Sequence, residues 1–171
     1  MSYTIRQLGL DDVPAYRALR LEALRNHPEA FASDYDSAAA KPDSFFTAMI
    51  ANLAFFGAFV DGRLVGIVAF DQSAGAREAH RGWLYQMYVQ PQMRGTGCAM
   101  ALIEHLLDYA KPLVLQVHLG VAADNGAALA LYQRAGFAIY GTEPRYMYVN
   151  GRYIDEHLMV RFLDKAPGDQ K

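Results

Sequence analysis

The sequence has almost no cysteine and no long hydrophobic run. Its single cysteine, Cys98, cannot form a disulfide within the chain, which is compatible with a reducing compartment. No window of the sequence approaches the roughly 18 consecutive apolar residues of a membrane-spanning helix. The first twelve residues lack a cationic start followed by an apolar stretch, so a secretory leader is not expected. We therefore predict a cytoplasmic protein that does not enter a membrane.

The chain also lacks an excess of charge of either sign. It has 16 Lys and Arg residues and 18 Asp and Glu residues, which gives a formal net charge of -2. Proteins that bind nucleic acids usually concentrate excess Lys and Arg on one face. A nucleic-acid partner is therefore not expected.

Apolar residues are abundant instead. They make up 53% of the 171 residues, which is enough to form the core of one domain. The sequence shows no internal repeat, low-complexity tract or linker that would divide it. We predict a single domain over 1–163, followed by a polar and flexible tail over 164–171.

Two glycine-containing turns predict β-hairpins at the two ends of the domain. Asp61-Gly62 and Asn150-Gly151 each separate two apolar or aromatic runs, and glycine accepts the positive φ of a tight hairpin turn without strain. The hairpin strands predicted from these turns are 55–60, 63–70, 137–149 and 152–162.

Helical and extended segments alternate between the hairpins. We expect Asp11 to cap the first helix, which ends near Asn26, and Asp43 or Ser44 to cap the second. This order predicts an α/β (α+β) fold with a mixed, mostly antiparallel sheet of about seven strands and helices on both faces. The remaining elements expected are strands over 4–8, 82–89 and 113–121, helices over 95–110 and 126–134, and a loop over 71–80.

A glycine turn follows the strand predicted at 82–89. It reads Gln92-Met93-Arg94-Gly95-Thr96-Gly97 and leads into the next helix. Glycine removes the side chains that would keep an anion away from backbone N–H groups, and a helix N-terminus attracts negative charge. By itself, a glycine pair before a helix is also compatible with a plain structural turn. We predict a pyrophosphate site on the backbone of 94–99, to which the Arg94 side chain adds positive charge.

A second motif lies one strand further along the chain, from Asn125 to Phe137. It reads NxxAxxLYxxxGF, with Tyr132 seven residues after Asn125 and Gly136 where the helix is expected to end. The order QxxGxG, strand, NxxAxxLYxxxGF resembles the acetyl-CoA-dependent N-acetyltransferases of the GNAT superfamily. The resemblance implies a GNAT domain in which the strands on either side of the glycine turn and its helix splay apart to admit the cofactor.

The resemblance also implies roles for individual residues. Asn125 would hydrogen-bond the pantetheine arm, and the backbone near Met87 would stabilise the oxyanion. Tyr132 would act as general acid at the thioester sulfur, because a nearby proton donor helps a thiolate to leave. No metal is expected. The residues predicted to bind acetyl-CoA are Met87, Tyr88, Val89, Gln92, Arg94, Gly95, Thr96, Gly97, Cys98, Ala99, Asn125 and Tyr132.

The expected reaction is direct attack by a neutral primary amine on the thioester carbonyl. It requires no covalent enzyme intermediate. An acyl-cysteine route through Cys98 is less favoured, since a lone cysteine at the apolar start of a helix is more often a small packing residue.

The sequence leaves the general base open. Many GNAT relatives place a glutamate on the strand before the phosphate turn, whereas the segment 83–89 contains no acidic residue. His118 is interpreted as a partly buried histidine on a covered sheet face in preference to a base. The candidates are Glu78, His80, His118, Asp155, Glu156 or a water chain.

The acceptor amine is left open as a small molecule, an amino acid or a protein N-terminus. By fold-level analogy, its pocket would be formed by the loop after the first helix, the 71–80 loop and the last hairpin. Arg20 and Glu22 could meet charge on the substrate, but they are interpreted in preference as part of a solvated helix face. Aromatic residues in strands more often fill cores than line sites. The candidate pocket walls are Phe31, Tyr35, Tyr85, Tyr146 and Tyr148.

Two functions from other classes are alternatives to the enzyme. A non-catalytic acyl-CoA-binding or regulatory module would keep the fold; the missing strand glutamate favours it, whereas Tyr132 favours the enzyme. Dinucleotide binding requires a GxGxxG turn after the first strand and an acidic residue about 20 positions later, and the sequence lacks this arrangement. A homodimer is left open, because no residue pattern marks its surface.

Overall fold

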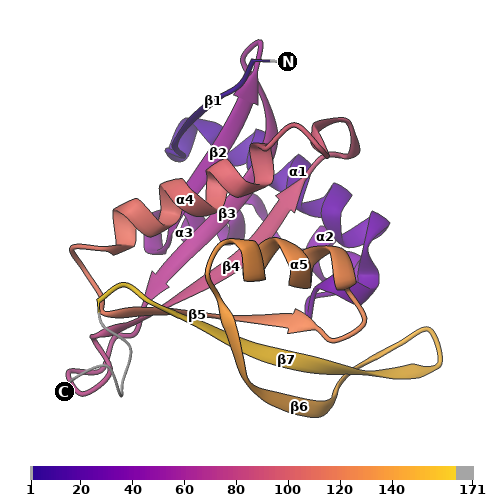
Figure 1. The fold of residues 1–171 in the computed structure, drawn as a ribbon. Coiled ribbons are helices and arrows are strands. Elements are labelled where there is room, and N and C mark those ends of the chain that lie inside the picture. The colour runs from indigo at the N-terminus through magenta and orange to yellow at the C-terminus, as the bar shows by residue number, and fades with distance from the viewer. Residues whose placement is uncertain (1, 165–171) are drawn as a thin grey trace. The chain divides into compact units, whose positions relative to one another are not determined.

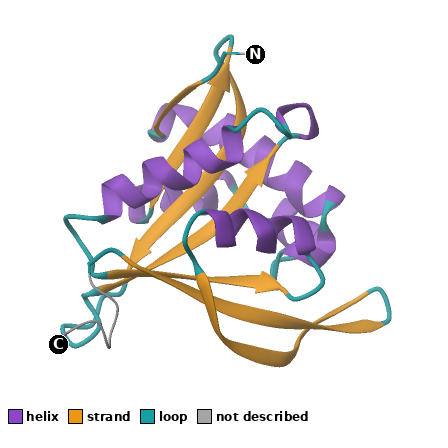
Figure 2. Cartoon of the chain, viewed as in Figure 1, coloured by secondary structure: helices purple, strands orange, loops and turns teal. Residues whose placement is uncertain are grey.

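The computed structural model describes residues 2–164, so the last seven residues of the predicted tail lie outside the described residues. The described residues form seven strands, five α-helices and three short 3-10 helices (Figures 1 and 2). The strands are β1 (Thr4–Gln7), β2 (Ala54–Val60), β3 (Arg63–Gln72), β4 (Arg81–Val89), β5 (Gln116–Ala122), β6 (Ala138–Val149) and β7 (Arg152–Phe162). The helices are α1 (Val13–Asn26), α2 (Tyr35–Ala39), α3 (Asp43–Asn52), α4 (Cys98–Ala110) and α5 (Gly126–Arg134), with 3-10 turns η1 (Leu10–Asp12), η2 (Pro28–Ala30) and η3 (Pro91–Met93).

The strands form one sheet in the order β1-β2-β3-β4-β5-β7-β6. The ladders β1–β2, β2–β3, β5–β7 and β6–β7 are antiparallel, whereas β4 pairs with β5 in parallel from Arg81 to Trp83. This arrangement confirms the predicted mixed and mostly antiparallel sheet of seven strands. The divergence of β4 from β5 beyond Trp83 stays a prediction.

The contacts divide the domain into two compact units. The first unit runs to Phe70 and includes Tyr85–Leu106, and the second consists of Asp71–Leu84 and the chain from Leu107 onward. Strand β4 and helix α4 therefore each contribute residues to both units. None of the helices within residues 2–164 combines the length and the apolarity needed to cross a membrane.

The first unit has helices on both faces of its strands. Phe55 and Phe56 are successive residues of β2 and therefore point to opposite faces. The Phe55 ring packs against Tyr16 of α1 with centroids 4.7 Å apart, and the Phe56 ring packs against His105 of α4 at 5.0 Å. Figure 1 shows α4 in front of β2 and β3, and α1 and α3 behind them.

In the second unit, a hydrogen bond connects the end of helix α5 to strand β7. Gly136 ends the helix with φ +85°, the left-handed conformation expected from the sequence. Arg161 of β7 donates a 2.6 Å hydrogen bond to the carbonyl of Ala135. The predicted hairpin turn between β6 and β7 is confirmed, with positive φ at both Asn150 and Gly151.

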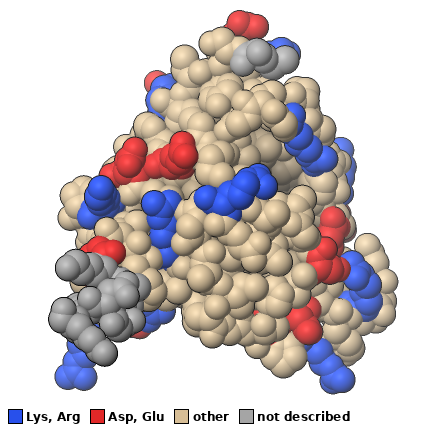
Figure 3. Space-filling view, viewed as in Figure 1, with Lys and Arg blue, Asp and Glu red and all other residues tan. Residues whose placement is uncertain are grey.

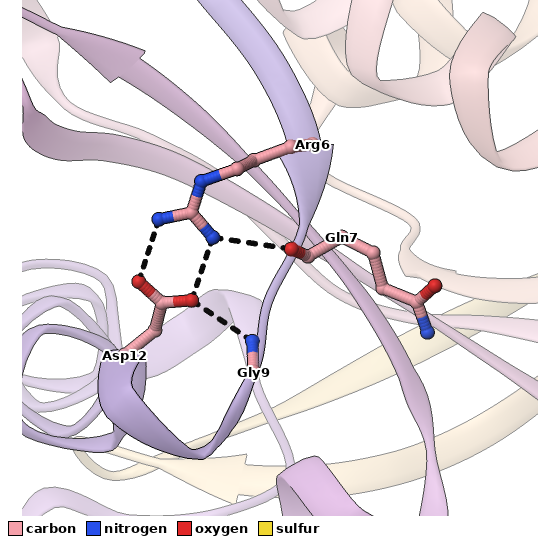
Figure 4. A network of polar contacts seen from close by, with 4 residues as sticks. All are labelled: Arg6, Gln7, Gly9 and Asp12. Carbon is pink, nitrogen blue, oxygen red and sulfur yellow. Dashed lines mark hydrogen bonds and ion pairs between the residues drawn. The ribbon is translucent and has the colours of Figure 1, made fainter.

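The predicted cap of the first helix is wrong by one residue. The helix begins at Val13 after the turn η1, and Asp12, not Asp11, occupies the N-cap position. The Asp12 carboxylate makes no cap hydrogen bond to α1, because it accepts two hydrogen bonds from Arg6, at 2.7 and 2.8 Å, and one from the Gly9 N–H at 2.8 Å (Figure 4). This network closes the connection from β1 to α1.

The starts of α4, α3 and β5 also differ from the predicted ones, and each difference has a local cause. Helix α4 begins at Cys98 instead of Gly95, because Gly95 and Gly97 have positive φ values that a right-handed helix excludes. Helix α3 starts at Asp43 itself, with Pro42 as its N-cap. Strand β5 begins three residues later than predicted, since the N–H of Leu113 still bonds to Ala110 O at 2.9 Å.

Both signs of charge are spread over the surface. On the face that Figure 3 shows, basic and acidic side chains both occur and most of the surface is neutral. This distribution agrees with the small net charge of the chain.

Candidate functional site

The turn between β4 and α4 has the backbone geometry of an anion site. Gly95 and Gly97 have φ values of +76° and +84°. The N–H of Ala101 donates to Gly97 O at 3.0 Å, so the helical hydrogen bonds begin there. The N–H groups of Thr96 and Cys98 make long hydrogen bonds within the turn, at 3.4 Å to Met93 O and to Thr96 Oγ1, and those of Ala99 and Met100 have no carbonyl one turn earlier. Among the described residues, no atom lies within 4 Å of a methyl group placed on Gly95. An anion can therefore approach this backbone closely.

Side chains of the turn mostly hold the turn together. Thr96 Oγ1 donates to Met93 O at 2.7 Å, and Gln92 Nε2 donates to Gln90 Oε1 at 2.7 Å. Arg94 Nη2 lies 3.0 Å from Nε2 of His27, at the end of α1. Of these predicted cofactor residues, Arg94 is the one that carries positive charge to the turn.

The Cys98 side chain is fully buried in the first turn of α4. Its burial raises the pKa of the thiol, which disfavours the thiolate that a nucleophile needs. The structure therefore supports the interpretation of Cys98 as a packing residue whose backbone N–H belongs to the turn.

Strand β4 is fixed to helix α1 through Glu22. The Tyr88 hydroxyl donates to Glu22 Oε1 at 2.9 Å, and Gln90 Nε2 donates to Glu22 Oε2 at 2.8 Å. Burial and the bond to Glu22 raise the pKa of Tyr88 to about 12, so its hydroxyl stays protonated. The interpretation of Glu22 as a solvated residue is wrong. Met87 and Val89, on either side of Tyr88, are half-buried.

An irregularity in β4 was not predicted. Gln86 has φ +52°, which is uncommon for a residue with a side chain. The Tyr16 hydroxyl donates to Gln86 Oε1 at 2.9 Å and holds this point of the strand against α1. No glycine or asparagine in 83–89 marks the irregularity, so the sequence offered no signal for it.

Arg20 is buried, although the sequence interpretation expected it to be exposed to solvent. Only 7% of its surface is exposed, and its guanidinium lies 4.7 Å from the centre of the Phe31 ring. Burial lowers the pKa of Arg20 to about 10. Its Nη1 is buried without a hydrogen-bond partner among residues 2–164. The interpretation as a solvated helix face is therefore wrong, because the apolar face of α1 includes this position.

In the second unit, Asn125 and Tyr132 lie at the two ends of α5. The Asn125 side chain is the N-cap, since its Oδ1 accepts a hydrogen bond from Ala128 N at 3.2 Å. Its Nδ2 amide group remains as a donor for another partner. Tyr132 is buried, and its ring contacts Phe137 edge-to-face with centroids 6.0 Å apart. Burial raises the pKa of its hydroxyl, which keeps it protonated at neutral pH.

Three of the five candidate bases are exposed at the surface of the second unit. Glu78 pairs with Arg81 at 3.1 Å, and His80 has an exposed side chain. The Asp155 carboxylate accepts a 2.8 Å hydrogen bond from the Arg145 N–H, so it stabilises the irregular part of β6.

His118 is buried within an aromatic cluster. Its ring lies beside Trp83, with centroids 5.2 Å apart, and its Nδ1 is 3.3 Å from the Tyr140 hydroxyl. Its Nε2 is 2.8 Å from the Gln116 side-chain amide nitrogen. Burial lowers the pKa of His118, which favours the neutral ring, and the buried position agrees with the interpretation of His118 as a histidine on a covered sheet face.

Glu156 is the half-buried acidic candidate. Its carboxylate lies against Gly120 of β5, so closely that a methyl group on Gly120 would collide with it. Glu143 of β6 is its cross-strand partner. Burial, followed by the charge of Glu143, raises the pKa of Glu156. The same two carboxylates, after burial, raise the pKa of the Tyr146 hydroxyl.

The aromatic residues predicted to line the acceptor pocket do not all belong to the same unit. Phe31 lies against Arg20, and Tyr35 contacts Arg25 in the first unit, which also contains the exposed Tyr85. The second unit contains the exposed residues Tyr146 and Tyr148.

The order of the sheet and the glycine turn between β4 and α4 define the fold of an N-acetyltransferase. A model described as the acetyltransferase (GNAT) family matches residues 17–137. The chain belongs to this family of acyltransferases.

Several curated relatives are similar over part of the chain. The L-amino acid N-acetyltransferase AaaT of Escherichia coli is 30% identical over 61% of this chain and 65% of its own length. The spermidine N(1)-acetyltransferase of Vibrio cholerae is 35% identical over 50% of the chain and 51% of its own length. The N-alpha-acetyltransferase RimI of Mycobacterium tuberculosis is 36% identical over 63% and 65%, respectively. The chain thus spans about half to two thirds of these relatives.

Solved structures share the fold. An acetyltransferase of the GNAT family from Streptococcus pneumoniae has a TM-score of 0.84 and 24% identity, covering 94% of this chain and 99% of its own. The structure of yncA from Salmonella typhimurium with its cofactor acetyl-CoA has a TM-score of 0.79 and 20% identity, covering 98% of each chain.

Proposed function

We propose that the protein is an N-acetyltransferase that moves the acetyl group of acetyl-CoA to a primary amine by direct attack. The observation that carries the proposal is the turn from Arg94 to Gly97, with two positive φ values and free space beside Gly95 at the start of α4. The amino-acid, spermidine and N-alpha-acetyl activities named for the relatives support an amine as acceptor.

The residues of the turn fit a diphosphate. Backbone N–H groups of 95–99 would bind its oxygens, and Arg94 would add charge-assisted hydrogen bonds. The backbone of Met87, Tyr88 and Val89 and the free amide group of Asn125 would hold the pantetheine arm. When bound, acetyl-CoA supplies an activated thioester, and the protein supplies position and proton transfer.

Tyr132 is proposed as the general acid. In the transfer, a bond forms between the amine nitrogen and the acetyl carbon while the carbon–sulfur bond breaks. One proton leaves the nitrogen, and the sulfur takes one up. The Tyr132 hydroxyl is proposed as the source of that proton, since burial raises its pKa and it is protonated at neutral pH.

Among the open candidates for the base, we favour Glu156. It is the one acidic candidate that is half-buried, and its pKa is raised toward the range in which a carboxylate accepts protons well. Gly120 supports this choice, because the missing side chain leaves the space that the carboxylate occupies. The other acidic candidates, Glu78 and Asp155, are exposed and already paired with Arg81 and a backbone N–H.

Two measurements test the proposed function together. Calorimetric titration with acetyl-CoA should give saturable heat, and release of free thiol should follow addition of an amine from a broad panel. Saturable binding without thiol release on any amine would favour the alternative, a non-catalytic acyl-CoA-binding module. The cytoplasmic location, a homodimer, and the lack of nucleic-acid, membrane and metal partners stay predictions of the sequence.

A further inference from the structure

We infer that the acceptor amine carries a carboxylate group and that Arg20 binds it, which makes free amino acids the substrate class. The inference rests on the proposed function and specifies its acceptor. It starts from one observation, a buried cation whose charge no described residue balances.

Arg20 is buried in a mainly uncharged environment. Its surface is 7% exposed, its guanidinium lies over the Phe31 ring, and it interacts electrostatically with Tyr16. Among residues 2–164 no carboxylate forms an ion pair with it, and its Nη1 lacks any hydrogen-bond partner. A buried guanidinium without a partner destabilises a fold, so such an arrangement is expected where a ligand supplies the missing acceptor.

Two hydrogen bonds join α1 to β4 on either side of Arg20 in the helix. Tyr16 bonds to Gln86, and Glu22 accepts from Tyr88, so α1 and β4 run alongside each other between these points. Arg20 lies between Tyr16 and Glu22 in α1 and is therefore level with the strand around Met87. The family resemblance assigns the oxyanion contact to that part of the strand. A small acceptor bound at Arg20 would therefore lie next to the proposed oxyanion contact.

The charges disfavour the other acceptor classes named for relatives. A polyamine has only cationic groups, which Arg20 would repel at close range. Glu22, the acidic side chain of α1, already accepts hydrogen bonds from Tyr88 and Gln90. The first residue of a protein N-terminus has no free α-carboxylate, because that group forms the first peptide bond. A free amino acid presents two oxygens, which match the forked donors of a guanidinium.

Matched pairs of an L-amino acid and its amide test this inference. The pairs should cover small, apolar, aromatic, acidic and basic side chains, with spermidine and a trialanine amide as further probes. Binding is measured by saturation-transfer NMR with the protein and CoA, and acetylation by thiol release. At least one acid should bind and react at least tenfold better than its amide, although the amide has the less basic and more often neutral amine.

Three variants show whether Arg20 causes the preference. Arg20→Met keeps an unbranched side chain in the buried space and should lower the acid-to-amide ratio at least tenfold. Arg20→Lys should retain part of it. Arg17→Met is the control for loss of an α1 arginine. Arg17 lies one turn earlier, pairs with Asp43 at 3.4 Å and donates to Ala39 O at 3.2 Å, so its charge already has a partner although its Nε makes no hydrogen bond among residues 2–164, and its loss should leave the ratio unchanged. All three should bind acetyl-CoA with unchanged affinity.

The outcomes separate this inference from the proposed function. Binding of acids over amides that depends on Arg20, but without acetylation, supports the inference and contradicts the proposed activity. An acid preference that survives Arg20→Met overturns the inference, as do amides or spermidine that bind or react as well as the acids. Failure of every acid to bind also overturns it.

Discussion

The hydroxyl of Tyr16 on α1 donates a 2.9 Å hydrogen bond to Oε1 of Gln86, the one residue of β4 with a positive φ, +52°. The contact joins the buried face of α1 to the irregular point of the strand that precedes the glycine turn. Strain in the backbone and a hydrogen bond in the side chain therefore occur at the same residue.

Two substitutions of Gln86 separate these effects. Gln86→Ala removes the partner of the buried Tyr16 hydroxyl and keeps the strained backbone, so we expect a loss of about 1–3 kcal/mol in the free energy of unfolding. Gln86→Gly also relieves the strain and should be about 1 kcal/mol more stable than the alanine variant. Urea denaturation measures both. An alanine variant more stable than the glycine variant would show that the strand is regular at this position.

Gly95→Asp should weaken acetyl-CoA binding by about 100-fold, equivalent to about 2.7 kcal/mol. The substitution places a carboxylate beside the N–H groups proposed to bind phosphate. Gly62→Asp is a matched control, because Gly62 also has φ +76° and no neighbour among the described residues within 4 Å of an added methyl group. Both variants should lose similar stability, whereas only the first should lose affinity in calorimetry. Equal affinities would remove the turn from the cofactor site.

Tyr132→Phe should lower kcat by about 100-fold and leave the affinity for acetyl-CoA within about twofold. The ring contact with Phe137 is retained, so the variant removes the proton donor alone. Tyr153→Phe, which removes an exposed hydroxyl on β7, should not change either value. Steady-state kinetics and calorimetry provide the measurements, and a loss of affinity with unchanged kcat would contradict the general-acid role.

Glu156→Gln should lower kcat by about 100-fold or more and remove the acidic limb of the pH profile. The base acts in its ionised form, so activity should rise as the pH increases through the pKa of Glu156. Burial and Glu143 raise this pKa above 4.5, which places the limb above pH 4.5. Glu143→Gln removes one cause and should shift the limb to lower pH. If Glu156→Gln keeps the wild-type profile, another group is the base.

Asp12→Asn should reduce stability by about 1 kcal/mol at pH 7, a modest value because the Arg6 partner is half exposed. The hydrogen bond from Arg6 lowers the pKa of Asp12, and the Gly9 N–H adds to this effect. A lowered pKa stabilises the fold fully above the unfolded-state pKa, near 3.8, and the contribution is lost as the pH falls through the folded-state value. Denaturation of both proteins at pH 7 and pH 2 should show a difference that vanishes in acid. Asp11→Asn is the exposed control.

Much of the fold was predictable, because its signals are local. The turns Asp61-Gly62 and Asn150-Gly151 set the hairpins, and both have the positive φ values expected of them. Helix starts were less predictable. Asp11 and Asp12 are equivalent as caps in sequence, and the choice between them depends on Arg6, which comes from the preceding strand.

Within the candidate site, the sequence identified the two motifs, whose roles stay predictions, and it did not identify the side chains that pack around them. The charged residues Arg20 and Glu22 read as a solvated helix face, because helical spacing does not reveal what packs against a helix. One of them is buried beside Phe31, and the other accepts hydrogen bonds from β4.

The sequence by itself determined the family, the strand and helix order and the glycine turn, since each depends on residues close together in the chain. Only the tertiary structure decided which charges are buried and which are paired. It set Arg20 in a buried position without a counter-charge and Glu156 over Gly120. Burial and pairing depend on neighbours contributed by distant segments, and these neighbours determine the free energy of a charge.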